Sequence, residues 1–361
     1  MRLYHISLSF YLLSCVKYVF LHLCLEPVSF HITFHLHMRS LHKGPPHAKI
    51  VKIKLKEAGP IMLSIVERIN ELKRQRNAVV LAHYYQQAEI QDMADFVGDS
   101  FDLSRRARDV QADVIVFCGV YFMAESAKIL NPGKAVLLPV LSAGCPMADM
   151  VTPEDVLELR RQYPEAAVVC YVNSSAAVKA ESDICCTSSN AVKIVKSLQQ
   201  RQIIFVPDRN LGHYVSRFVP EKELICFQGF CPTHERVGTE DVAAARAARP
   251  GAVVLVHPEC PPAVVDAADF AGSTAQIIKD AAESDALEFI IGTEQGILHC
   301  LQKQNPGKQF YLLSPRLFCV NMKKTGMEDV LAVLENMSNK IELDEDLAAR
   351  ARNCLERMLQ A

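Results

Sequence analysis

An internal repeat of about 87 residues constrains the fold of this chain more than any other feature of its sequence. Three apolar runs end in polar motifs of one design, VVLAHYYQ at 79–86, VVCYVNS at 168–174 and VVLVHPE at 253–259. The equivalent residues His83, Tyr171 and His257 are 88 and 86 residues apart. This period is too long for a solenoid unit but suits a small domain, which predicts three copies of one domain.

Within each copy, short β-branched runs alternate with amphipathic stretches, as at 78–82, 114–118 and 135–140 of the first copy. This alternation is typical of parallel strands joined by helices. The predicted fold class is therefore α/β, with three homologous three-layer α/β domains whose parallel sheets surround a pseudo-threefold axis. The predicted boundaries are 62–144, 145–230 and 231–340, followed by a C-terminal helix within 341–361.

The first 56 residues differ from the rest of the chain. They contain seven of the twelve histidines and eight Lys or Arg, but only one acid, Glu26. The apolar run at 6–25 is long enough for a membrane span or a signal sequence, but Lys17 and His22 interrupt it. We expect residues 1–56 to be a disordered extension or the product of a mis-set start codon, with a membrane or signal segment as the alternative.

The charge of the chain argues against a nucleic-acid partner. The whole sequence has a net charge of −2, and residues 57–361 have 31 basic against 40 acidic residues. Such a chain offers no broad positive field for a phosphate backbone. No GxGxxG or GxxxxGK[ST] motif is present, so a nucleotide cofactor has no support either.

Thirteen cysteines are present, an odd number, and no two form a CxxC pair. This argues against a disulfide framework and an ordinary zinc ribbon, and it favours a reducing, cytoplasmic location. Three of them, Cys145, Cys231 and Cys319, follow equivalent strands at spacings of 86 and 88 residues. Because ligands bind beyond the carboxyl ends of parallel strands, these three cysteines are expected to converge where the copies meet.

Three convergent thiolates suit a [4Fe–4S] cluster in which one iron has no protein ligand. Such an iron is open to substrate and can act as a Lewis acid. A zinc ion bound by three cysteines and water is an alternative, and three unrelated core cysteines are another.

The strand ends also bring acid/base groups together, namely His83, Tyr85, Tyr171, His257 and Glu259. Ser188–Asn190 and Gly272–Thr274 precede predicted helices, where backbone N–H groups and hydroxyls can hold phosphate or carboxylate oxygens. Plain helix capping is the alternative for these two stretches. Together the groups predict a pocket for a small polyanionic substrate.

Ordered motifs over about residues 62–361 resemble the quinolinate synthase family, the A protein of bacterial NAD biosynthesis. They are HYYQ at 83–86, GDSFDLS at 98–104, AGC at 143–145, YVNSSAAVKAESD at 171–183, CTSSNA at 186–191, GFCPTHE at 229–235, HPEC at 257–260, AGST at 271–274, GTEQG at 292–296 and CVNMKK at 319–324. The resemblance implies a transferase that condenses iminoaspartate with dihydroxyacetone phosphate, losing phosphate and two waters, to give quinolinate. It also implies a [4Fe–4S] cofactor, functional coupling to an L-aspartate oxidase, and no membrane partner.

Carried over by motif, the resemblance implies Cys145, Cys231 and Cys319 as cluster ligands. It implies Tyr85 and Glu259 as acid/base groups, assisted by Tyr171 and His257. The implied substrate-binding positions are His83, Ser100, Tyr171, Val172, Asn173, Ser188, His257, Pro258, Glu259 and Thr274. The chain departs from the family in its 56-residue extension and in Val320, where proline is more usual.

Two other functions remain open at this stage. The radical diphthamide-synthesis enzymes, which cleave S-adenosylmethionine, also place three cysteines in three domains. A non-catalytic iron or redox sensor would need the cysteines but neither Tyr85 nor Glu259.

Overall fold

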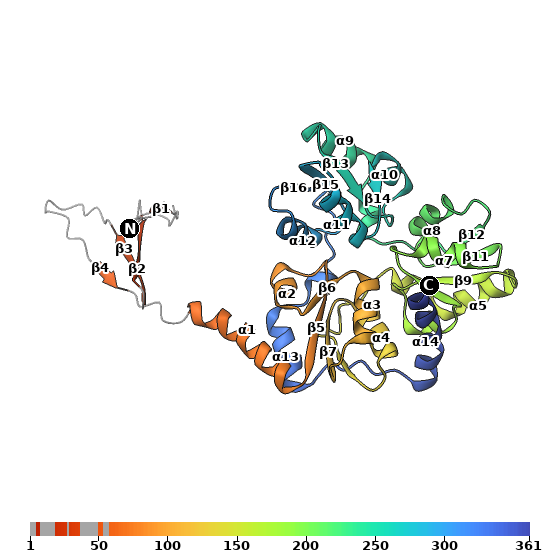
Figure 1. Cartoon of the computed structure of the whole chain (residues 1–361), viewed down its shortest axis with the longest axis horizontal. Helices are drawn as coiled ribbons and strands as arrows, with labels where there is room; N and C mark the ends of the chain where they lie inside the picture. The colour runs from red at the N-terminus through yellow and green to blue at the C-terminus, as the bar shows by residue number, and fades with distance from the viewer. Residues whose placement is uncertain (1–4, 8–18, 27–28, 37–49, 53–57) are drawn as a thin grey trace, which may run out of the picture. The chain divides into compact units, whose positions relative to one another are not determined.

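The computed structural model describes residues 5–7, 19–26, 29–36, 50–52 and 58–361, with side chains from residue 65 onward. The chain divides into two compact units, Met1–Glu67 and Arg68–Ala361 (Figure 1). The described strands of the first unit form an antiparallel sheet in the order β1 (His5–Ser7), β2 (Val19–Glu26), β3 (Ser29–Leu36) and β4 (Ile50–Lys52). Much of 1–56 lies outside the described residues, so the origin assigned to this segment stays a prediction. No helix in the described part of the chain is long and apolar enough to cross a membrane.

The second unit contains three four-stranded sheets in which all neighbouring strands are parallel. Their orders are β6-β5-β7-β8, β10-β9-β11-β12 and β14-β13-β15-β16, so each sheet repeats one topology. The strands are β5 (Ala78–His83), β6 (Phe96–Gly98), β7 (Val114–Cys118), β8 (Ala135–Leu137), β9 (Ala167–Tyr171), β10 (Ile184–Cys186), β11 (Gln202–Val206), β12 (Glu223–Cys226), β13 (Val253–Val256), β14 (Phe270–Ala271), β15 (Glu288–Gly292) and β16 (Gln309–Leu312). The predicted α/β class with three repeated units is confirmed.

Helices alternate with these strands in chain order. They are α1 (Ala58–Gln75), α2 (Ala88–Met93), α3 (Ser100–Asp109), α4 (Tyr121–Leu130), α5 (Pro153–Gln162), α6 (Ala176–Ala180), α7 (Ala191–Ser197), α8 (Arg209–Ser216), α9 (Thr239–Ala248), α10 (Pro262–Ala267), α11 (Thr274–Glu283), α12 (Ile297–Gln304), α13 (Met327–Asn336) and α14 (Glu345–Gln360). Short 3₁₀ helices follow the three repeat-related cysteines: η1 (Ala148–Met150), η2 (His234–Arg236) and η3 (Asn321–Lys323).

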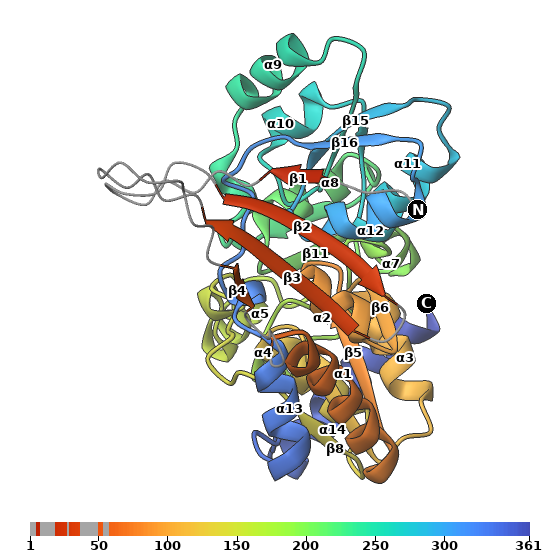
Figure 2. The ribbon, with the colours of Figure 1, turned by 90° about the vertical axis from the view of Figure 1, so that its left-hand side faces the viewer.

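The end of the chain returns to the first two copies. The α13 helix lies against the first copy (Figures 1 and 2), where it contacts β7. Lys340 forms an antiparallel bridge with Leu137 at the edge of the first sheet. The α14 helix packs against α4 of the first copy and against α6 and β10 of the second. Its buried Cys354, Leu355 and Met358 belong to the same hydrophobic core as the first two sheets. The last helix therefore holds these two copies together.

The same combination of a hydrogen bond and an ion pair, both made by one aspartate, sets the register in all three sheets. Each copy has an aspartate at the start of its edge strand whose Oδ2 accepts a hydrogen bond from the first strand, and whose Oδ1 pairs with a cation. The hydrogen bonds are Val80 N–Asp95 (2.8 Å), Val168 N–Asp183 (2.7 Å) and Val254 N–Asp269 (2.8 Å), and the ion pairs are Lys73–Asp95 (2.7 Å), Arg160–Asp183 (2.9 Å) and Arg246–Asp269 (2.9 Å). Because the strand starts are fixed alike, the strand ends emerge alike in each copy.

We predict that Asp183→Ala destabilises the second sheet by about 1–3 kcal/mol, because it leaves the N–H of fully buried Val168 without its acceptor. Hydrogen exchange followed by mass spectrometry should show that Asp183→Ala speeds exchange in β9 relative to wild type. The change in β5 and β13 should be smaller. Asp109→Ala is the matched control, since Asp109 pairs only with its exposed neighbour Arg108. Unchanged exchange in β9 would show that the aspartate does not set the register.

Candidate active site

The carboxyl ends of the central strands of all three copies open into one cavity of about 170 Å³. The cavity is lined by twelve of the residues that the sequence predicted: His83, Tyr85, Ser100, Cys145, Tyr171, Asn173, Ser188, Cys231, His257, Glu259, Thr274 and Cys319. The side chains of Val172 and Pro258 are buried but do not line it. The structure thus brings together groups that lie up to 236 residues apart, from His83 to Cys319.

The three cysteines reach the cavity from equivalent turns. Each is followed by a 3₁₀ helix, whose backbone N–H groups favour the thiolate: Ala148 and Met147 for Cys145, His234 for Cys231, and Met322 and Asn321 for Cys319. Burial nevertheless raises the pKa of all three thiols, to about 12 for Cys145. These sulfurs stay protonated unless a cation binds, and the N–H groups are already placed for ligating thiolates.

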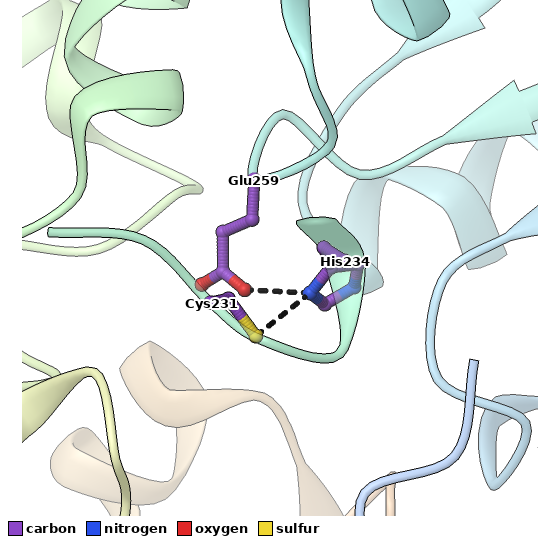
Figure 3. Close-up of side chains that lie close together, drawn as sticks. All are labelled: Cys231, His234 and Glu259. Atoms are coloured by element: carbon purple, nitrogen blue, oxygen red, sulfur yellow. Dashed lines mark hydrogen bonds and ion pairs between the residues drawn. The ribbon is translucent and has the colours of Figure 1, made fainter. Parts of the chain in front are cut away.

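Glu259 is the centre of the hydrogen-bond network in the cavity. The Tyr171 hydroxyl donates to its Oε1 at 2.6 Å, and the Nδ1 atom of His234 lies 2.8 Å from its Oε2. Figure 3 shows His234 between Glu259 and the sulfur of Cys231, which is 3.2 Å from the same Nδ1. Burial opposes ionisation of Glu259, but His234 and the Tyr171 hydroxyl, which hydrogen-bond to its two oxygens, hold its pKa well below the ordinary value. Glu259 is therefore a buried, ionised carboxylate.

His83 and His257 are neutral hydrogen-bond donors. The Nδ1 atom of each accepts a backbone N–H two residues later, from Tyr85 at 3.1 Å and from Glu259 at 3.2 Å. The ring proton must then lie on Nε2, and in His257 this atom is 3.1 Å from Ser188 Oγ. Burial lowers the pKa of His83 to about 3 and that of His257 to about 4. Both rings can donate to a substrate oxygen without adding a charge.

A continuous hydrogen-bonded chain joins Glu259 to Tyr85. The Nε2 atom of His234 lies 2.8 Å from Thr293 Oγ1, which lies 2.6 Å from the Tyr85 hydroxyl. The Tyr85 hydroxyl also lies 2.8 Å from Thr274 Oγ1. Burial raises the pKa of Tyr85 well above 10, so its proton leaves only when a base receives it. Thr293 and His234 therefore connect the Tyr85 hydroxyl to Glu259 by a continuous line of groups along which a proton can pass.

Sequence reasoning did not single out His234 and Thr293, although both lie inside the quoted motifs at 229–235 and 292–296. Their positions in the sequence could have marked them as site residues. His234 is three residues after a repeat-related cysteine, and Thr293 directly follows β15. Neither position has the same residue in the other copies, so the repeat alone did not mark them.

Hydroxyls from the three copies lie at helix starts beside the cavity. Ser100, Ser188 and Thr274 are equivalent in the repeat, and the first and last open α3 and α11. The Ser189 hydroxyl donates to Asp99 Oδ2 at 2.7 Å and lies 2.9 Å from Ser273 Oγ, which ties the caps of these two helices together. At the start of α3 the Asp99 carboxylate already accepts the N–H groups of Phe101 and Asp102, whereas at the start of α11 Ser273 accepts only that of Gln276. The start of α11 can therefore bind phosphate or carboxylate oxygens.

Comparison with known proteins gives one consistent answer. A family model described as "Quinolinate synthetase A protein" matches residues 67–360. The chain belongs to the quinolinate synthase family. It is 56% identical over 296 residues to a quinolinate synthase of Caldicellulosiruptor saccharolyticus, covering 82% of this chain and 98% of the relative. It is 52% identical over 295 residues to "Quinolinate synthase 2" of Methanosarcina acetivorans, covering 82% and 95%.

Membership of the quinolinate synthase family confirms the resemblance seen in the motifs, and with it the prediction that the chain is an enzyme. It sets aside both the diphthamide-type and the sensor alternatives. The roles of individual site residues, the cofactor and the domain boundaries stay predictions.

The lowered histidine pKa values predict a specific loss of stability in acid. An unfolded histidine titrates near pH 6.5, whereas folded His257 titrates at about 4, so the unfolded chain takes up the proton first as pH falls. Stability should therefore decrease from about pH 6.5 toward 4, and His257→Gln should flatten this part of the curve. Thermal midpoints at pH 7, 6 and 5 measure the effect, with exposed His213→Gln as the control. Parallel curves for wild type and His257→Gln would contradict a neutral, buried His257.

Proposed function

We propose that this chain makes quinolinate for NAD biosynthesis by condensing iminoaspartate with dihydroxyacetone phosphate, with loss of phosphate and two waters. Family membership supports the activity. The observation that carries the proposal is that three repeat-related cysteines and an acid/base network line the same cavity. An L-aspartate oxidase is the proposed source of the unstable iminoaspartate, delivered by direct contact or by diffusion.

The proposed cofactor is a [4Fe–4S] cluster held by Cys145, Cys231 and Cys319. The donor set fits this group, since three thiols at equivalent turns of the repeat face one cavity and each is served by backbone N–H groups. When bound, the cluster would supply an iron with an open coordination position that polarises a hydroxyl or carboxylate. Cys231, His234 and Glu259 also offer ligand atoms within 4.8 Å of one another, so a single metal ion is the competing occupant.

The chain's own residues supply proton transfer and orientation. Tyr85 is proposed to donate or accept a proton at the substrate, and Glu259 to exchange it through His234 and Thr293. Tyr171 keeps Glu259 oriented, while neutral His83 and His257 donate to substrate oxygens. The start of α11, with the hydroxyls of Ser100 and Ser188, is proposed to hold the phosphate or carboxylate oxygens.

The cofactor proposal predicts the outcome of anaerobic purification of the full chain. About four iron and four sulfide per chain are expected, with a brown chromophore and quinolinate production from the two substrates. Cys145→Ala, Cys231→Ala and Cys319→Ala should each lose chromophore and activity together. Cys118→Ala, a buried position at the end of β7 that does not line the cavity, should retain both. A cavity variant with full absorbance would remove that cysteine from the ligand set, and zinc without sulfide would point to the single-ion alternative.

The acid/base proposal predicts that Tyr85→Phe and Glu259→Gln lower kcat by about 10²–10⁴-fold while the iron content stays unchanged. Each variant removes one end of the hydrogen-bonded chain that joins the two residues. Tyr214→Phe is the control, because the Tyr214 hydroxyl donates to the Ala271 carbonyl outside the cavity. Steady-state quinolinate assays with parallel iron analysis provide the measurement. Wild-type kcat in both variants would rule out this route for the proton.

A further inference from the structure

The third cysteine turn lacks a constraint that the other two possess. Cys145 and Cys231 are followed by Pro146 and Pro232, whereas Cys319 is followed by Val320. Proline fixes its own φ near −65° and restricts the residue before it, so the first two turns are stiffened by their sequence. Val320 is 60% exposed, so packing does not replace the missing proline.

A buried carboxylate binds this third turn at both ends. Glu294 is fully buried, and its Oε1 accepts the backbone N–H of Cys319 at 3.1 Å. Its Oε2 accepts from Lys323 Nζ at 2.9 Å, at the end of η3, and from the backbone N–H of Gly296 at 2.7 Å. One side chain thus joins the residue before Val320 to the end of the turn.

The residues equivalent to Glu294 in the other two copies do not bind a cysteine turn in this way. By the repeat spacing, Glu294 corresponds to Val120 in the first copy and Asp208 in the second. Val120 is apolar, and Asp208 caps α8 by accepting the N–H of Leu211 at 2.8 Å. The carboxylate that binds the cysteine turn therefore occurs in the one described copy whose cysteine has no proline after it.

Lys323 extends the connection to the first copy. Besides pairing with Glu294, its ammonium donates to the backbone carbonyl of Tyr85. Only 12% of the Lys323 side chain is exposed, and 1% of Glu294, so each charge depends on the other for compensation. The position of the third cysteine is thereby coupled to that of Tyr85.

We propose that Glu294 is the positioning residue for Cys319 and that, with Lys323, it fixes the third cysteine turn as proline fixes the other two. This inference rests on the proposed role of Cys319 as a cluster ligand and deepens it. A less restrained Cys319 should bind its iron less durably and should be more exposed to reagents when no cluster is present.

The central experiment compares Glu294→Ala with the double variant Glu294→Ala/Val320→Pro in the full chain. The φ of Val320 is −55°, within the range of proline, so the turn can accept the substitution. Glu294→Ala should lose iron to a chelator several-fold faster than wild type, and adding Val320→Pro should restore most of the difference. Glu294→Gln keeps an acceptor for the Cys319 N–H, so its rate of iron loss should lie between those of wild type and Glu294→Ala. Equal iron loss in wild type and Glu294→Ala, or no recovery on adding proline, overturns the proposal.

A second readout does not depend on a cluster. In cluster-free protein, site-resolved alkylation by iodoacetamide should be several-fold faster at Cys319 in Glu294→Ala, with Cys145 and Cys231 in the same sample as internal standards. Lys323→Met should act in the same direction. Lys324→Met is its matched control, since Lys324 donates to the Ser142 carbonyl instead. Uniform acceleration at all three cysteines would indicate general unfolding and contradict positioning.

The two readouts separate this proposal from the one on which it rests. If wild-type protein binds no iron and sulfide, the cofactor proposal fails, while the alkylation rates still report whether Glu294 holds the Cys319 turn. If wild type holds a cluster but Glu294→Ala alters neither iron release nor alkylation, the positioning role fails alone.

Discussion

A single buried carboxylate determines how the three copies must fit together. Glu259 is 4% exposed and ionised, a state that is costly unless several donors surround it. Those donors are Tyr171 from the second copy and His234 from the turn that opens the third, and Thr293 continues the chain to Tyr85 of the first. No single copy could satisfy this carboxylate. The hydrogen-bond network around Glu259 is therefore complete only when all three sheets are packed together, so assembly of the fold and assembly of the cavity depend on each other.

The repeat places similar side chains at equivalent positions of the three copies, and residues that differ between copies complete the hydrogen-bond network of the cavity. Equivalent strand ends carry His83, Tyr171 and His257. His83 and His257 are neutral donors with the ring proton on Nε2, and the Tyr171 hydroxyl donates to Glu259. Ser100, Ser188 and Thr274 keep a hydroxyl at every equivalent helix start. The symmetric positions thus provide similar groups in every copy, whereas the hydrogen-bonded path from Glu259 to Tyr85 passes through His234 and Thr293, which differ from the residues at the equivalent positions of the other copies.

The sequence was sufficient for features that recur locally. Strands, their parallel order and the convergence of the three cysteines followed from apolar periodicity and the 86- and 88-residue spacings. His234 and Thr293 were missed because their role depends on contacts between copies, which no spacing encodes. The α13 helix was missed for a similar reason: it follows the last strand of the third sheet, and its place is set by packing on β7 of the first. Val172 and Pro258, expected from motif position, are buried away from the cavity because alternate strand-end residues point in opposite directions.

Charge balance in the cavity explains why its other donors are neutral. Glu259 and Glu294 are both buried carboxylates, and Lys323 compensates only the second. Burial lowers the pKa of His83 and of His257, so both rings stay neutral and keep an Nε2 donor without adding a charge beside Glu259. The three thiols, held protonated by burial, add no negative charge until a cationic group enters. An anionic substrate can then be held by N–H groups, hydroxyls and neutral imidazoles, because these donors add no further negative charge beside the ionised Glu259.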